Sequence, residues 1–322
     1  MFTLIVVAII GNGLILFAIS SRKTLQKLPN LFIASLAFAD MFVAIFVMPF
    51  ALVNDFGNWP FEKTVCILWI STDVLCSTAS ITNLCAISLE RYIHVKNPLQ
   101  YFKWITKSNV LISIAGIWIS SCLVSCVPVF MDIHSGNNFK HFHLKNGTCS
   151  PSFSFEYSVL SSLFSFFAPC CIMLLIYYHV YQLAQHHMES IRHLNEPLLR
   201  LRKIHLNQKT CHSSEQVPSV FRKSGRRVIK RSRFLKTISN SPHVQEHKAA
   251  ITIGILMGVF MLCWTPFFIV NILAGMCTKC VSETTFQAFS WLGYSNSAFN
   301  PIIYSIFNSE FRRAFASILF RK

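Results

Sequence analysis

One carboxylate in the sequence, that of Asp73, lies in the middle of an apolar stretch, Val65–Ile93, that is long enough to cross a lipid bilayer. No Lys or Arg follows or precedes it within reach along the same helix. A charge in the membrane interior costs about 2.5–3.5 kcal/mol on insertion scales and needs a partner. We therefore expect Asp73 to bind the cation of a ligand. Hydrogen bonding to neighbouring helices, or protonation, is the alternative.

A second polar group falls at mid-membrane depth in three different apolar stretches. Its side chains carry carboxylate, hydroxyl and amide oxygens, the donors that small hard cations prefer. The alternative is a hydrated polar network that binds no specific ion. The group consists of Asp40, Ser80, Asn296, Ser297 and Asn300.

The elements that carry these residues are membrane spans. The chain is 53% hydrophobic and only 13% charged, and its apolar residues form blocks of about 20 or more rather than amphipathic stripes. The predicted fold is an all-α membrane protein, a seven-transmembrane helix bundle in one domain, with a short amphipathic helix at residues 308–320. The predicted spans are Phe2–Ser20, Leu28–Val53, Val65–Ile93, Val110–Phe130, Tyr157–Leu183, Ala249–Met276 and Phe286–Ile306.

Lysine and arginine predict the orientation of these spans. Of the 29 Lys and Arg residues, all but Lys63, Lys140, Lys145 and Lys279 fall on one face, which the positive-inside rule makes cytoplasmic. The C-terminus is therefore expected inside the cell. The net charge of +16 is expected to serve orientation and contacts with anionic lipid, not nucleic-acid binding. The basic segment 185–245 is expected to be disordered, and the first span follows Met1 with no N-terminal tail.

Cysteines divide between the two faces and the membrane. Of the 12, Cys66, Cys149, Cys277 and Cys280 fall at the oxidising outer face. We expect a Cys66–Cys149 bridge and a possible small ring between Cys277 and Cys280. A metal site formed by the four is the alternative, although no His or acidic cluster accompanies them. Asn146 begins an N-glycosylation sequon on the same face.

Short motifs occur in order along the predicted helices. They are Gly11-Asn12, Leu36-Ala37 with Asp40, Glu90-Arg91-Tyr92 followed by Pro98-Leu99, Trp118, Pro169, Cys263-Trp264-Thr265-Pro266 and Asn300-Pro301-Ile302-Ile303-Tyr304. Together they make the chain resemble the rhodopsin-like (class A) family of G-protein-coupled receptors. One departure is Glu90, where the family usually has Asp, and it keeps a carboxylate beside Arg91.

This resemblance implies a conformational switch on the inner face and a plasma-membrane receptor. An ion pair between Arg91 and Glu246 would stabilise the closed position of the sixth helix by about 1 kcal/mol. Pro266 would kink the same helix, so that a small change near Trp264 and Phe260 produces a larger displacement of its cytoplasmic end. The implied partners are a heterotrimeric G protein, arrestin, a receptor kinase and membrane lipid, with sodium in the Asp40 group as a possible ligand. The switch residues are Glu90, Arg91, Tyr92, Pro98, Leu99, Tyr177, Glu246, Phe260, Pro266, Pro301 and Tyr304.

Within the family, the run from Asp73 to Ile81 is similar to the aminergic receptors, in which this carboxylate pairs with an ammonium. Serines on the fifth helix would face it and aromatic rings would lie between. These serines either form hydrogen bonds with the ligand or donate only to carbonyl groups of their own helix. The expected ligand-binding residues are Asp73, Val74, Cys76, Ser161, Ser162, Ser165, Trp264, Phe267, Phe268, Asn271, Trp291 and Tyr294.

The segments Ile87–Lys96, Glu246–Ala250 and Trp291–Asn300 resemble the type-one dopamine receptors of invertebrates, which couple to the stimulatory G protein and raise cyclic AMP. Beta-adrenergic-like octopamine receptors are the second interpretation, and serotonin and other amine receptors come after them. A light-sensing protein is disfavoured because the seventh span has no Lys that could form a Schiff base with retinal. An enzyme is disfavoured because no nucleophile–base pair is visible, and a transporter because no repeat symmetry is visible.

Overall fold

The computed structural model describes residues 1–57, 59–134, 142–145, 148–151, 155–183, 242–277 and 280–320, together with residues 185 and 189. The chain divides into two compact units, Met1–Tyr177 with Thr252–Lys322 and Tyr178–Ile251. The candidate site lies in the first unit. Two predicted features lie outside the described residues, namely most of the inner loop 185–245 and the sequon at Asn146.

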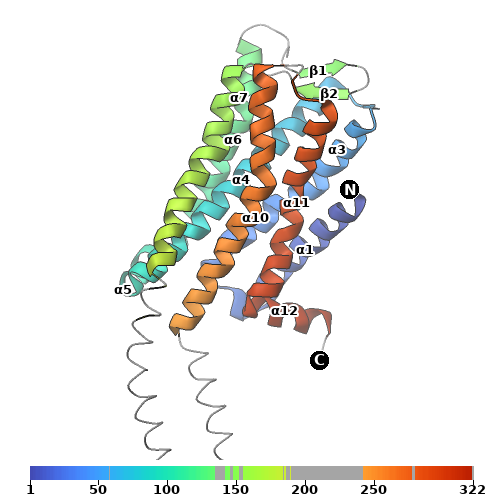
Figure 1. Cartoon of the computed structure of the whole chain (residues 1–322). Helices are drawn as coiled ribbons and strands as arrows, with labels where there is room; N and C mark the ends of the chain where they lie inside the picture. The colour runs from blue at the N-terminus through green and yellow to red at the C-terminus, as the bar shows by residue number, and fades with distance from the viewer. Residues whose placement is uncertain are drawn as a thin grey trace, which may run out of the picture. The chain divides into compact units, whose positions relative to one another are not determined.

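Long helices dominate the described part of the chain, and they run side by side in the first unit (Figure 1). Within the described residues, six stretches are long and apolar enough to cross a membrane, and α11 covers the seventh predicted span. The helical elements are α1 (Phe2–Ser21), η1 (Lys23–Leu25), α2 (Asn30–Phe42), η2 (Val43–Val47), α3 (Met48–Asp55), α4 (Lys63–Lys96), α5 (Pro98–Trp104), α6 (Lys107–His134), α7 (Phe155–Ser162), η3 (Leu163–Phe167), residues 168–183, α10 (Pro242–Met276), α11 (Glu283–Phe307) and α12 (Ser309–Leu319).

Two of the spans contain a π-helical turn that the sequence analysis did not predict. The turn η2 ends two residues before Pro49, and η3 ends two residues before Pro169. A proline has no backbone N–H and its ring crowds the carbonyl one turn earlier, so a widened turn can accommodate it without breaking the helix. Ser165 lies inside η3, so its position relative to Ser161 differs from that in a regular α-helix.

The first unit is packed around α4, which contacts α2 and α6, while α1 packs against α2 and α11. Gly11 allows α1 to approach α11, because a Cβ at this position would lie 2.7 Å from the Cγ atom of Pro301. The neighbouring Asn12 donates from Nδ2 to the carbonyl oxygen of Ser297 at 2.8 Å. The Gly11-Asn12 motif thus fixes α11, and with it the polar residues of α11, against α1.

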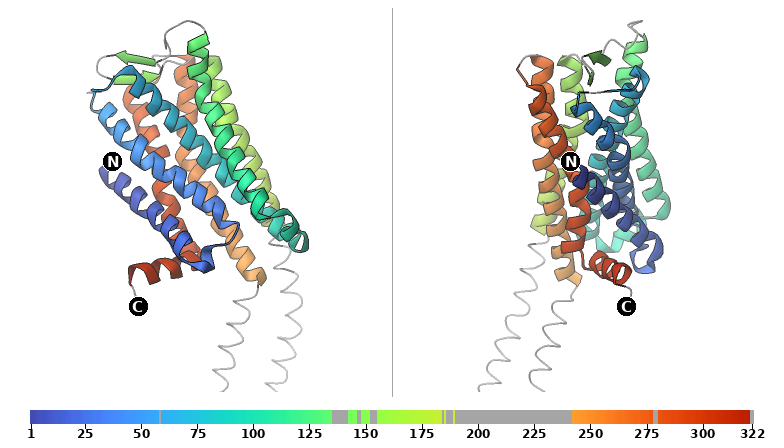
Figure 2. Two further views of the ribbon diagram at one scale, coloured as in Figure 1. Left: turned by 180° about the vertical axis from the view of Figure 1, so that it is seen from behind. Right: turned by 90° about the vertical axis from the view of Figure 1, so that its right-hand side faces the viewer.

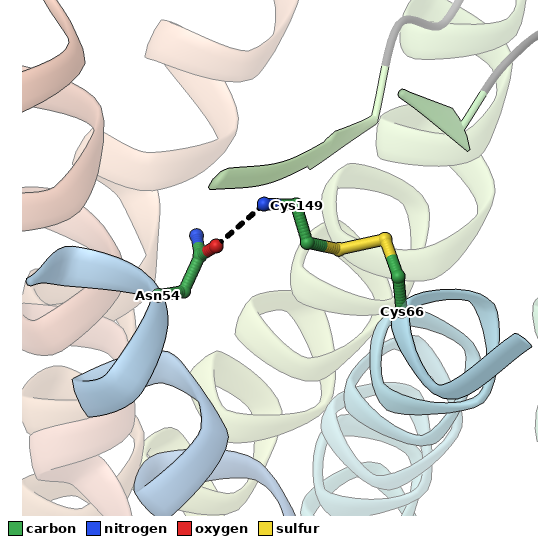
Figure 3. The surroundings of a disulfide bond; sticks show 3 residues. All are labelled: Asn54, Cys66 and Cys149. Atoms are coloured by element: carbon green, nitrogen blue, oxygen red, sulfur yellow. Dashed lines mark hydrogen bonds between the residues drawn. A yellow bond between two sulfur atoms is a disulfide. The ribbon is translucent and has the colours of Figure 1, made fainter. Parts of the chain in front are cut away.

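A disulfide marks one end of the first unit. Cys66, at the start of α4, is bonded to Cys149 in a hairpin of β1 (Phe142–Lys145) and β2 (Thr148–Pro151), which the all-α prediction did not include. The backbone N–H of Cys149 also donates to Oδ1 of Asn54 in α3 at 2.7 Å, so that α3, α4 and β2 are joined at one point (Figure 3). The second predicted pair, Cys277 with Cys280, is bonded as well.

The opposite end carries α12, which runs across the ends of α1 and α11 (Figure 2). Asn308 caps this helix by accepting from the backbone N–H of Glu310 at 3.0 Å. Its apolar face, Phe311, Ala314 and Phe315, is buried. The predicted amphipathic helix at 308–320 is therefore present over Ser309–Leu319.

Candidate ligand-binding and switch sites

Asp73 lies on α4 and is held by two neutral hydroxyl groups. Tyr294 of α11 donates to its Oδ2 atom at 2.7 Å, and Ser77, one helical turn further along α4, donates to Oδ1 at 3.1 Å. The two salt bridges of the described residues involve other groups, so Asp73 has no cationic partner among them. Ser77 was not predicted as a site residue, although its spacing of four residues from Asp73 places the two side chains on the same face of α4.

Aromatic rings surround the Tyr294 side of this carboxylate. The ring of Trp264 lies 6.4 Å from that of Tyr294 and 5.6 Å from that of Phe267, both edge to face. Gly293 allows the approach, since a Cβ there would lie 2.9 Å from the Trp264 ring. The predicted aromatic wall is therefore assembled from α10 against α11.

Phe166 extends this wall, and the sequence analysis did not single it out. Its ring stacks on that of Phe268 at 4.4 Å with an interplanar angle of 12°, and it lies 6.0 Å from Phe260. Phe166 is fully buried inside η3. It thereby joins the serine-bearing helix to the α10 aromatic residues, a contact that no local pattern in a phenylalanine-rich chain distinguishes.

The predicted serines lie on α7 and η3 and are engaged within the protein. Ser161 donates to the carbonyl oxygen of Ser158 at 3.3 Å, and Ser165 donates to the carbonyl oxygen of Ser161. Ser162 is buried and accepts from Nδ2 of Asn271 at 3.2 Å. The back-bonded arrangement is thus present for Ser161 and Ser165, while Ser162 links α7 to α10. Each hydroxyl oxygen still has a lone pair with which to accept.

Three further members of the predicted set lie on α4 and α11. Val74 is half-buried beside Asp73, and Cys76 is fully buried. Trp291 packs edge to face on Tyr294 at 5.7 Å, and its indole N–H donates to Oδ2 of Asp55 at 2.5 Å. Asp55, the last residue of α3, was not in the predicted site.

The second polar group is assembled around Asp40, which is fully buried on α2. Its Oδ1 atom accepts from Ser80 at 3.1 Å and from Ser297 at 3.0 Å, and its Oδ2 atom accepts from Asn300 at 2.6 Å. Asn296 is also buried, and its Oδ1 atom finds no hydrogen-bond partner among the described residues. Oxygen atoms from α2, α4 and α11 are therefore concentrated here.

The far end of α4 carries the predicted switch. The Oε2 atom of Glu90 lies 3.1 Å from Nε of Arg91, and its Oε1 atom accepts from the hydroxyl of Tyr101 in α5 at 2.6 Å. Burial and the adjacent Glu90 carboxylate raise the pKa of Tyr101 above its ordinary value, which keeps the phenol protonated as a donor. Tyr101 was missed by the sequence analysis. The side chain of Glu246, in α10, lies outside the described side chains, so its pairing with Arg91 stays a prediction.

The remaining switch residues lie on α4, α5, the helical residues 168–183, α10 and α11. Tyr92 accepts from Nζ of Lys96 at 2.8 Å, and Leu99, which follows Pro98 at the start of α5, is 96% exposed. Tyr177 fits against Gly254 so closely that a Cβ at Gly254 would overlap its hydroxyl. Pro266 and Pro301 lie inside α10 and α11, and Tyr304 and Phe260 are buried.

Comparisons with known proteins agree with this arrangement. Residues 11–304 match the model of the 7 transmembrane receptor (rhodopsin family). The chain is 46% identical over 320 residues to "Dopamine receptor 1" of Drosophila melanogaster, which covers 98% of this chain and 60% of that protein. It is 36% identical to "D(1) dopamine receptor" of Carassius auratus and 34% identical to "Octopamine receptor beta-2R" of Chilo suppressalis, covering 85% and 77% of them. The chain thus spans about three fifths of the Drosophila protein's length.

Proposed function

We propose that this chain, which belongs to the rhodopsin family of seven-transmembrane receptors, is a cell-surface receptor for a biogenic amine, with dopamine first, that acts through the stimulatory G protein and raises cyclic AMP. The observation that carries the proposal is the state of Asp73. A half-buried carboxylate within a membrane span has only the neutral hydroxyls of Tyr294 and Ser77 as partners among the described residues. A ligand's ammonium group is the missing countercharge.

The neighbouring side chains favour an amine with an aromatic ring. Trp264, Phe267 and Phe268 supply ring edges and faces for stacking. Beyond them, Ser162 is tied to Asn271, and the oxygen atoms of Ser161 and Ser165 remain able to accept hydrogen bonds. A cation, a short spacer, a ring and one or two ring hydroxyls match this sequence of groups, as in a catecholamine or phenolamine.

Dopamine is preferred to octopamine because the similarity to the Drosophila dopamine receptor, at 46%, is well above the 34% shared with the octopamine receptor. The test is a panel of dopamine, octopamine, tyramine and serotonin applied to cells that express the chain, with cyclic AMP as the readout. We expect dopamine to act at the lowest concentration. A lower effective concentration of octopamine would assign the second candidate, and no cyclic AMP response to any amine would contradict the proposal.

Removal of the serine hydroxyls tests whether they form hydrogen bonds with the hydroxyl groups on the ligand's ring. We expect Ser161→Ala and Ser165→Ala each to weaken dopamine by up to about tenfold, since one hydrogen bond contributes about 0.5–1.5 kcal/mol. Phenethylamine, which lacks the ring hydroxyls, should lose less in the same variants. Equal losses for both ligands, measured by competition binding, would mean that the serines only shape the helix through their bonds to Ser158 and Ser161.

We place the disulfide end of the first unit outside the cell and the α12 end in the cytoplasm of a plasma-membrane protein. The distribution of Lys and Arg and the Cys66–Cys149 disulfide support this orientation. The exposed Leu99 on the short helix α5 would then face the G protein, while arrestin and a receptor kinase would meet the same face.

Leu99 tests that docking role. A leucine that is 96% exposed contributes little to the fold, so Leu99→Ala should leave antagonist binding unchanged. The potency with which the amine raises cyclic AMP should fall by about tenfold. Gln100→Ala, at the adjacent exposed position of α5, is the matched control and should behave as the parent. If the two variants signal alike, Leu99 is not part of the G-protein contact.

The Asp40 group fits a sodium ion, which we propose as an allosteric ligand there. Its carboxylate, the Ser80 and Ser297 hydroxyls and the Oδ1 atom of Asn296, which has no hydrogen-bond partner in the described part of the chain, are hard oxygen donors. These residues would hold the cation and compensate the buried Asp40 charge. Sodium would supply only charge, without chemistry of its own.

A further inference from the structure

A second carboxylate, Asp55, is connected to the amine-binding carboxylate through two aromatic side chains. Asp55 ends α3 and accepts the indole N–H of Trp291 at 2.5 Å. Trp291 packs edge to face on Tyr294 at 5.7 Å with an interplanar angle of 86°. Tyr294 in turn donates to Oδ2 of Asp73 at 2.7 Å. Three contacts therefore lead from an acidic group at the disulfide end to the proposed ligand anchor.

Each contact in this series is of a kind that fixes orientation. Trp291 is only 8% exposed, so its N–H needs an acceptor, and an ionised acceptor makes the stronger hydrogen bond. The Tyr294 ring is held between two indoles, Trp291 at 5.7 Å and Trp264 at 6.4 Å, and both meet it edge to face. With its ring restrained in this way, the Tyr294 hydroxyl has a fixed direction toward Asp73.

We propose that Asp55 is a positioning residue for amine binding, which orients Trp291 and Tyr294 so that Asp73 presents its Oδ1 side to the ammonium group. This inference rests on the proposed function and deepens it. Asp73 has two oxygens, and Tyr294 engages Oδ2 while the weaker 3.1 Å bond from Ser77 is at Oδ1. A ligand can therefore displace the Ser77 bond at the lower cost, provided that Tyr294 keeps the carboxylate from rotating.

The competing explanation is that Asp55 attracts the ammonium group by its charge alone. Glu283, at the start of α11, is near enough to act electrostatically on Asp55 and is exposed. A pure charge effect would be shared by Glu283 and screened by salt. A positioning effect depends on the acceptor atom that faces the indole, so an uncharged acceptor in the same place should retain most of it.

Substitutions at Asp55 separate the two explanations. We expect Asp55→Ala to lower dopamine affinity by about tenfold, as for the loss of one hydrogen bond to a charged group, whereas Asp55→Asn, which keeps an acceptor of the same shape that makes a weaker bond, should lose much less. Glu283→Gln should match the parent. If Asp55→Asn loses as much affinity as Asp55→Ala, or if Glu283→Gln shares the loss, charge is responsible and the proposal is overturned.

A double-mutant cycle tests the route. In a Tyr294→Phe receptor, which lacks the hydroxyl that reaches Asp73, Asp55→Ala should cause no further loss of dopamine affinity. A loss that persists there would reveal a general structural role and would overturn the proposal. Trp291→Phe, which keeps a ring but removes the N–H donor, should reproduce the effect of Asp55→Ala, and this variant tests the same contact if Asp55→Ala does not reach the cell surface.

The same assay distinguishes failure of this inference from failure of the proposed function. Asp73→Asn, measured beside the Asp55 variants at matched surface expression, tests the anchor itself. If Asp73→Asn still binds dopamine, the amine-receptor proposal fails. If Asp73→Asn loses binding while Asp55→Ala does not, the receptor proposal stands and only the positioning role of Asp55 is wrong.

Discussion

Replacing Asp73 by asparagine is expected to abolish amine activation. The amide keeps the size of the carboxylate and an acceptor for Tyr294 or Ser77, but it removes a charge-assisted hydrogen bond to the ligand worth about 1.5–3 kcal/mol, together with Coulomb attraction that a low dielectric enlarges. Potency should fall by about a hundredfold or more. The measurement is cyclic AMP against dopamine concentration in cells with equal receptor numbers at the surface.

The same substitution should leave the unliganded protein at least as stable as the parent. A charge in a membrane span is costly, so its removal from a site without a cationic partner relieves a penalty. Thr72→Ala is the matched control and should keep the parent's dopamine potency, since the Thr72 hydroxyl donates to the carbonyl oxygen of Leu68 on its own helix. Full dopamine potency in a surface-expressed Asp73→Asn receptor would refute the anchoring role.

Removal of the Cys66–Cys149 bridge is expected to lower the stability of the protein more than removal of the Cys277–Cys280 disulfide. The bridge joins residues separated by 83 positions, and breaking a native disulfide that closes a long loop typically costs about 2–5 kcal/mol. It also ties β2 to α4 next to the Asn54 contact with α3. We expect Cys66→Ser with Cys149→Ser to lower the thermal midpoint of ligand binding in detergent and to reduce the amount of receptor at the surface.

The second disulfide supplies the control for that experiment. Cys277 and Cys280 are only three residues apart, so their bond restricts the unfolded chain much less. The double variant Cys277→Ser with Cys280→Ser should therefore shift the midpoint less than the Cys66 pair. Equal shifts for the two pairs would show that loop closure does not determine the contribution of these bonds.

The spans could be predicted from sequence because a bilayer requires long apolar helices whose backbone hydrogen bonds are internal. The predicted Phe2–Ser20 corresponds to α1, Phe2–Ser21, and the predicted Phe286–Ile306 lies inside α11. The π-turns η2 and η3 were not predicted, because Pro49 and Pro169 indicate a local disturbance without specifying whether the helix kinks or widens.

The candidate site was predicted where the residue type itself was improbable in a membrane. Asp40 and Asp73 are such residues, and the structure surrounds each of them with polar donors. Tyr101 and Asp55 were missed because neither is unusual at the end of a span, and their importance depends on contacts with Glu90 and Trp291 that lie 11 and 236 residues away. Such contacts between different helices depend on helix packing, which a single sequence does not reveal.

The packing of α12 against Tyr304 connects that helix to α11. The Tyr304 ring lies 5.4 Å from Phe311, which is fully buried, and Phe311 contacts Phe315 at 5.8 Å. Exposing a buried phenylalanine to water costs about 1.5–3 kcal/mol, so a rotation of Tyr304 should carry the capped helix with it instead of leaving Phe311 behind. A spectroscopic probe attached at the exposed Ala316 would then report, from the rim of the molecule, movements that begin in the interior of α11.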